Sequence, residues 1–135
     1  YNFTTNKASE TYIAYCFSEV AGFSRIGFYI GNGRTDGTFV FCGFRPAWLL
    51  IKKSSAAGSW VLWDNKRNPH NVCDIDINPN RDFAEDYYSN HDVDFLSNGF
   101  KLRDSNTSLN NGTYVYMAFA QSPFVSSKGV PATAV

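Results

Sequence analysis

The sequence has no excess of charge, because 12 Lys and Arg balance 12 Asp and Glu. Without a basic excess there is no positive electrostatic field of the kind that attracts a protein to nucleic acid, so nucleic acid is not expected as a partner. No apolar run approaches the roughly 20 residues that span a bilayer, and no signal-peptide pattern opens the chain, so membrane insertion is not expected either. The chain starts at Tyr1 rather than Met, which suggests a piece of a longer polypeptide.

Cysteine is scarce, and the spacing of the three cysteines does not match a metal site. Cys16, Cys42 and Cys73 lie far apart with no C-x-x-C pair, which argues against a zinc knuckle and a redox dithiol. The odd number predicts free thiols in a protein folded in a reducing cytoplasm, with one disulfide and a spare thiol as the alternative. Cys16 and Cys42 fall within strand-like patterns and are expected to be buried.

Motifs of cofactor and nucleophile chemistry are missing as well. No G-x-S-x-G, P-loop or G-x-G-x-x-G sequence occurs. His70 and His91 have no His or Cys partner at ligand spacing, so both are expected to be exposed loop residues. We therefore predict a protein that is not an enzyme and needs no cofactor. The acidic residues from which a glycan-cleaving carboxylate pair could be drawn are Glu85, Asp86, Asp92 and Asp94.

The sequence is rich in aromatic residues, at 17%. Short segments alternate between apolar and polar side chains, and Gly-, Asn- and Asp-containing turns separate them, as is typical of strands joined by hairpins. The predicted strands cover residues 11–20, 24–30, 38–44, 47–53, 59–64, 93–96, 100–103 and 113–121. With no convincing amphipathic helix, the pattern predicts an all-β protein, an antiparallel two-sheet β-sandwich of jelly-roll type, with a barrel as the alternative.

One long segment departs from this alternation. Residues 65–94 are polar, rich in Asn and Asp, and carry two of the five prolines. Long connections in compact domains are usually functional or mobile, so a variable binding region is expected here. We predict a single sandwich domain over residues 1–121 that includes this loop region, followed by an extended C-terminal arm at 122–135 that contacts a neighbouring subunit.

The loop region contains one metal-like spacing. Oxygen-bearing side chains follow positions 1, 3, 5, 7, 9 and 12 of a calcium loop, at Asp74, Asp76, Asn78, Asn80, Asp82 and Glu85. Pro79 stands where such loops turn at glycine, and no helix flanks them. A Ca²⁺ site and a solvated acidic loop are therefore both open.

The same region offers side chains suited to sugars. Sugar rings stack their C–H faces on aromatic rings while nearby polar groups bond the hydroxyls. The candidate ligand-binding residues are Tyr87, Tyr88, His91 and Asp92. Trp60 and Trp63 fall on opposite faces of one strand, and Trp48 and Trp60 are assigned to the core.

Several strings are similar to those of a known family: ETYIAYCFSEV, YIGNG, GFRPAWLLIK, SWVLWD, DFLSNGFKLR and TYVYMAFAQSPF. Together they resemble the C-terminal β-sandwich domains of tailed-bacteriophage fibres and other virion-attached proteins, from Glu10 to Ala134. The resemblance brings no catalytic residues, and residues 72–92 depart most from it.

The resemblance implies a structural and host-attachment role at the virion surface, after assembly in the cytoplasm of a bacterial host. The implied partners are two further copies in a homotrimer, other virion proteins and a host surface glycan. The alternatives are a lectin-like carbohydrate-binding module, with or without Ca²⁺, and a polysaccharide depolymerase.

Overall fold

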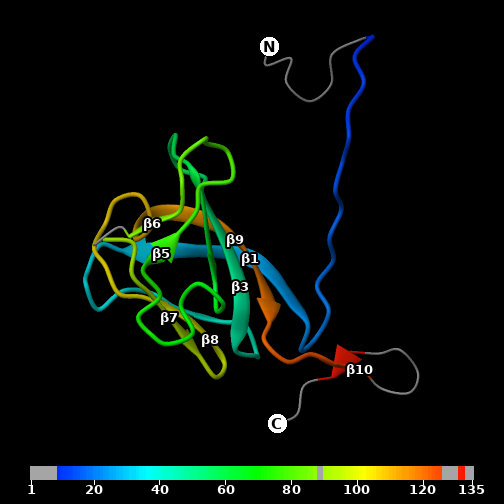
Figure 1. Ribbon diagram of the computed structural model, residues 1–135. Coiled ribbons are helices and arrows are strands. Elements are labelled where there is room, and N and C mark those ends of the chain that lie inside the picture. The colour runs from blue at the N-terminus through cyan, green and yellow to red at the C-terminus, as the bar shows by residue number, and fades with distance from the viewer. Residues whose placement is uncertain (1–8, 88–89, 126–130, 133–135) are drawn as a thin grey trace.

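The computed structural model describes residues 9–87, 90–125 and 131–132. Two antiparallel sheets form the body of the molecule (Figure 1). The larger has the order β1-β9-β3-β4, and the smaller the order β2-β8-β7. No helix occurs among the described residues, so none there is long and apolar enough to cross a membrane. The predicted all-β, antiparallel two-sheet sandwich is confirmed.

The strands of the larger sheet are β1 (Ser24–Asn32), β3 (Pro46–Lys53), β4 (Trp60–Asp64) and β9 (Asn111–Ala120). Those of the smaller sheet are β2 (Phe39–Phe41), β7 (Val93–Leu96) and β8 (Gly99–Leu102). Two short pairs complete the set, β5 (Ile75–Asp76) with β6 (Asp86–Tyr87) and β10 (Phe124–Val125) with β11 (Pro131–Ala132).

The core lies between the two sheets. Each strand turns alternate side chains inward, and the largest buried ones include Trp63, Tyr114, Phe95 and Phe100. Trp63 is fully buried whereas Trp60 is 38% exposed, so the predicted opposition of these two residues is confirmed. Assigning Trp60 to the core was wrong, because it occupies the outward phase of β4. Trp48 is also outside the core cluster, since it is half-buried beside Phe119 on the other face of the larger sheet.

The chain ahead of β1 contradicts the predicted strand at residues 11–20. These residues form an arm whose strand pairing, among the residues that the structure describes, is limited to an isolated bridge between Val20 and Ser24. Beyond that bridge the Glu19 side chain takes the position of a partner strand, since its Oε1 accepts the backbone N–H of Ile26 at 3.1 Å. Residues 11–20 do alternate in polarity, but their backbone turns away from β1 and does not pair with it.

The cysteines divide between the body and the arm. All three thiols are free. Cys42 and Cys73 are buried, and burial raises the pKa of Cys42 to about 12 and that of Cys73 to about 11. Cys16 lies on the arm and is exposed, which corrects the expectation that it is buried.

The clearest sequence signal, residues 93–103, forms the expected hairpin. β7 and β8 pair from Val93↔Leu102 to Leu96↔Gly99. Gly99 has a second role there, because a Cβ at this position would lie 2.0 Å from the carbonyl oxygen of Val40 on β2. The residue is therefore required by the close approach of β2 and β8.

Candidate functional site

The loop region between β4 and β7 is tied to itself at its base. Arg67 bridges Asp64, at the end of β4, and Glu85, whose Oε2 lies 2.6 Å from Arg67 Nε. The hydrogen bond to Glu85 raises the pKa of Arg67, so the guanidinium stays charged. Asn68 Nδ2 donates to Asp74 Oδ1 at 2.9 Å. These contacts join the two ends of a long connection into one ordered unit.

A buried pair anchors the middle of the loop region. His91 Nδ1 lies 3.0 Å from Asp76 Oδ2, and Asp76 is fully buried. The indole Nε1 of Trp63 donates to the carbonyl of His91 at 3.1 Å, which connects this pair to the core. The expectation of an exposed His91 is wrong, because its ring fills space beside a buried carboxylate. His70 is exposed as predicted.

The stretch from Ile77 to Arg81 is fastened along β4. Leu62 and Ile77 exchange two backbone hydrogen bonds, of 2.9 and 3.0 Å. The backbone N–H of Trp60 donates to Asn80 Oδ1 at 2.9 Å, and Arg81 Nε donates to Ser59 Oγ at 2.6 Å. Residues 77–81 therefore extend the edge of the larger sheet beside β4, and these contacts fix the position of Asp82 and Phe83, which follow them.

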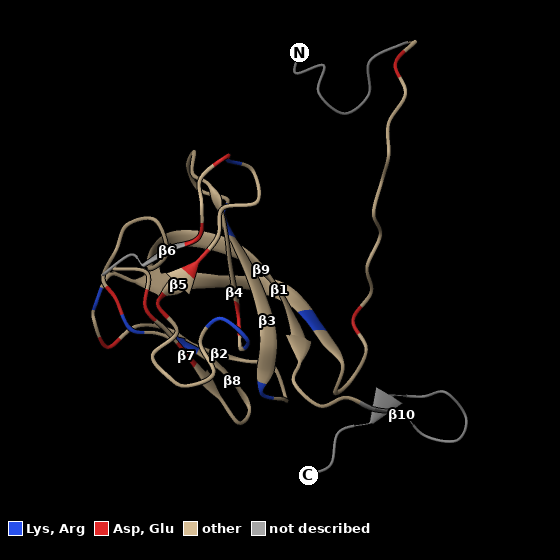
Figure 2. Ribbon diagram, viewed as in Figure 1, with Lys and Arg blue, Asp and Glu red and all other residues tan. Residues whose placement is uncertain are grey.

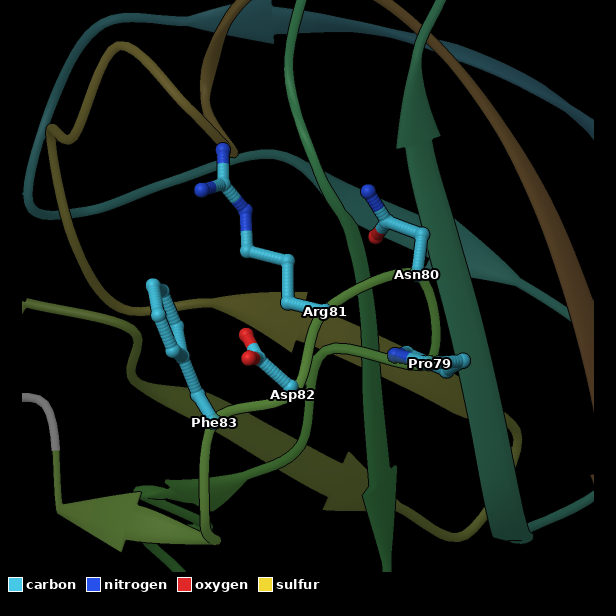
Figure 3. Close-up of a pocket in the computed structure, with 5 residues that line it drawn as sticks. All are labelled: Pro79, Asn80, Arg81, Asp82 and Phe83. Carbon is cyan, nitrogen blue, oxygen red and sulfur yellow. The ribbon is translucent and has the colours of Figure 1, made fainter.

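A shallow pocket opens where this fastened stretch ends (Figure 3). It is lined by Pro79, Asn80, Arg81, Asp82 and Phe83. The side chains of Arg81, Asp82 and Phe83 point to the same side of the loop, with the Arg81 guanidinium 5.3 Å from the centre of the Phe83 ring. An aromatic ring thus lies beside a cation and a carboxylate on an exposed surface.

A second, apolar hollow adjoins the first. Its lining consists of Leu50, Trp60, Pro79 and Asn80, so the two hollows share the latter two residues. Trp60 is available to it because the residue faces outward from β4. The surface therefore combines two aromatic residues, Trp60 and Phe83, with the hydrogen-bonding groups of Asn80, Arg81 and Asp82.

The predicted ligand-binding residues lie in different places. His91 is largely buried with Asp76. Asp92 has a raised pKa, through burial first and then through the charges of Asp104, Asp74 and Asp94. Tyr87 belongs to the short strand β6, and Tyr88 lies outside the described residues. None of the four lines the pocket at residues 79–83.

The calcium-loop residues have separate partners. Asp76 faces His91, Asp74 accepts from Asn68, and Glu85 pairs with Arg67. Asp76 Oδ1 and Asn78 Nδ2 are both buried without a hydrogen-bond partner among the described residues, and Asp82 is exposed in the pocket. Across the described part of the chain no three His, Cys, Asp or Glu side chains gather as a metal site would require. Asp74, Asp76 and Glu85 are thus held by separate partners, and the Ca²⁺ loop stays a prediction.

Two of the four acidic residues considered for glycan cleavage form ion pairs. Asp94 Oδ2 lies 2.8 Å from Arg103 Nε, and Glu85 is bound to Arg67. Asp86 lies in β6. Neither Glu85 nor Asp94 is among the residues that line the pocket.

The family model for a domain of unknown function, DUF7483, matches residues 2–123. The chain belongs to the DUF7483 family. The match covers the arm, both sheets and the loop region of this DUF7483 domain, and it ends before β10 and β11. No curated protein and no solved structure matches the chain.

The sequence pattern missed the residues that line the pocket. Arg81 and Phe83 belong to no motif, and their neighbour Asp82 was considered only as a calcium ligand. The available signal was the placement of Trp60 and Trp63 on opposite faces of one strand, which indicated that one of the two faces outward without indicating which.

Proposed function

We propose that the domain is a non-catalytic structural and host-attachment module of a bacteriophage fibre or another virion surface protein, and that it works as a homotrimer. The resemblance of its strings to virion-attached domains supports the biological setting. The observation that carries the attachment role is the loop region, which is bonded to β4 and presents Phe83, Arg81 and Asp82 at its surface.

The chemistry of this surface suits a bacterial surface glycan. An exposed aromatic ring can stack on the C–H face of a sugar, and Asp, Asn and Arg side chains bond its hydroxyls. Trp60 lies in the adjoining hollow and extends the stacking surface. Because the loop is held by several hydrogen bonds, little ordering entropy is lost when a ligand binds.

Binding to immobilised bacterial surface polysaccharides tests this proposal. We expect a glycan to be retained by the wild-type domain and lost, by at least about tenfold in Kd, in Phe83→Ala and Asp82→Ala. Phe41→Ala is the matched control, since Phe41 is exposed on β2 of the other sheet. Equal weakening by all three substitutions, or no retained glycan across the panel, would contradict the assignment.

Two further measurements separate the alternative functions. A depolymerase releases new reducing ends from the bound polysaccharide, whereas an attachment module releases none. A Ca²⁺-dependent lectin has a lower Tm with chelator, because a metal that binds the native state stabilises it. We expect neither effect.

A further inference from the structure

The outer face of the larger sheet is apolar. Residues that share a row across β1, β9 and β3 are paired as Ile26↔Met117 and Met117↔Leu50. The next row pairs Phe28↔Val115 and ends on β3 at Lys52. In a soluble antiparallel sheet the face away from the core is normally polar. Here Phe28 and Ile30 are 70% and 67% exposed. One chain therefore leaves an apolar sheet face open to water.

The arm ahead of β1 has the same character. Its residues 11–17 are extended, and Ile13 and Tyr15 are 83% and 82% exposed. The arm runs away from the sandwich, and it carries charge only near its two ends (Figures 1 and 2). Exposed, alternating apolar residues on an extended segment are typical of a strand that lacks its sheet.

The root of the arm already touches the apolar face. The ring centre of Phe17 lies 6.1 Å from that of Phe119 on β9, which is also 5.4 Å from Trp48 on β3. The arm leaves the body there, since Glu19 binds both the Ile26 N–H and Arg25 Nε, the latter at 3.3 Å. Gly22, with φ of 69°, allows the tight turn before β1.

The edge beside this root is open to a further strand. β1 is the end strand of its sheet and pairs with β9 alone among the described strands. Side chains hold its two ends, since the Ile26 N–H donates to Glu19, Thr38 Oγ1 donates to the Ile30 carbonyl at 2.9 Å and the Asn32 N–H donates to Asn110. The open stretch therefore centres on Phe28. An edge strand presents backbone N–H and C=O groups that bind another extended chain.

We propose that residues 13–17 of one chain add as a strand beside Phe28, on the open stretch of the β1 edge, in a second copy of the chain. The exposed arm and the open edge belong to the same sequence, so exchange between identical chains covers both. To reach Phe28, the chain's own arm would have to follow β1 from the Val20–Ser24 bridge past Ile26, whose N–H Glu19 already binds, whereas the arm of a second copy can pair beside Phe28 with Glu19 in place. The added strand widens the sheet, and its aromatic residues cover Phe28 and Ile30. This interface does not depend on the attachment role proposed above.

Light scattering of the full chain over a dilution series tests the interface. We expect an oligomer whose dissociation constant rises at least about tenfold in Tyr15→Asp and stays within about twofold in Phe41→Asp, the matched control on β2. Circular dichroism should show the same β spectrum for all three proteins, because Tyr15 is exposed in the single chain. A monomeric wild type at about 100 μM, or equal weakening by both substitutions, would overturn the proposal.

Cross-linking identifies the surfaces involved. Cys16 lies in the arm and is exposed, whereas Cys42 and Cys73 are buried. Ile26→Cys, Phe28→Cys and Ile30→Cys each place a thiol on the same face of the β1 edge. Under mild oxidation we expect at least one of them to give a reducible link between two chains, which disappears when Cys16→Ser is added. Links within one chain only, or no link at any of the three positions, would overturn the exchange.

Discussion

Asn110 forms several buried hydrogen bonds, although it belongs to no motif in the sequence. It is fully buried beside the start of β9, and its Nδ2 donates to Asn32 Oδ1, Arg34 O and Asp104 O within 3.0 Å. Its Oδ1 accepts the backbone N–H of Asn32 at 3.1 Å. One side chain thus closes the turn after β1 against the loop before β9.

Asn110→Ala should lower the free energy of unfolding by about 2–3 kcal/mol, because several buried polar groups lose their partner at once. Urea denaturation measures the change. Asn111→Ala is the control, since Asn111 is exposed one position further along the chain. Similar losses in the two variants would show that the network contributes little.

Asp92 gives a pH-dependent prediction. Its pKa is raised in the folded protein by burial and by the charges of Asp104, Asp74 and Asp94, so the native state binds its proton more tightly than the unfolded state. The ionised carboxylate therefore destabilises the fold at neutral pH, and this cost disappears as the pH falls below the unfolded pKa of about 3.9.

Asp92→Asn should accordingly raise Tm at pH 7 and have little effect at pH 3. Asp36→Asn should show the opposite sign at pH 7, because the hydrogen bond and charge of Lys101 lower the pKa of Asp36. Thermal melts of both variants across this pH range test the prediction. A gain for Asp92→Asn that persists at pH 3 would have another origin.

At the scale of elements, the β7–β8 hairpin depends on its glycine for close packing. Gly99→Ala places a methyl group against the Val40 carbonyl, a contact with backbone that no rotamer can relieve. We expect a loss of about 3 kcal/mol or more, since β2 must move away from β8.

Gly58→Ala is the matched control for this substitution. The nearest atom to its Cβ would be Lys53 Cβ at 3.6 Å, an ordinary contact, so a change within about 1 kcal/mol is expected. Chemical denaturation of the two variants in parallel compares them. Equal stability of Gly99→Ala and wild type would mean that the strands separate at no cost.

At the scale of the whole molecule, the segment after Gln121 is expected to contribute to the oligomer. Its described residues pair as Phe124↔Ala132 and Val125↔Pro131, a short hairpin rather than a single extended arm. Its proposed contact with a neighbouring subunit remains a prediction. Residues 126–130 and 133–135 lie outside the described part of the chain.

A chain that ends at Gln121 should dissociate at a higher protein concentration than the full chain, if the segment adds contact area to the oligomer. Light scattering over a dilution series measures this concentration, and the full chain should reach three times the mass of one subunit. An unchanged dissociation curve would remove the segment from the interface.

The fold class was determined by the sequence itself. Alternation of side chains is a property of each strand alone, so it predicted seven of the sheet-forming segments and the opposed positions of Trp60 and Trp63. The β7–β8 hairpin was predicted in the same way, because its two strands and its turn are consecutive in the sequence. In each of these cases the residues that decide the structure are close together in the chain.

The tertiary structure decided what each segment pairs with. Residues 11–20 alternate as well as any strand, yet the Glu19 side chain occupies the edge of β1 at Ile26 and residues 11–17 belong to no strand among the described residues. His91 is drawn inward by Asp76, and Phe83 is held in place through a loop bonded to β4. Such partners are far apart in sequence, and only the folded backbone brings them within hydrogen-bonding distance.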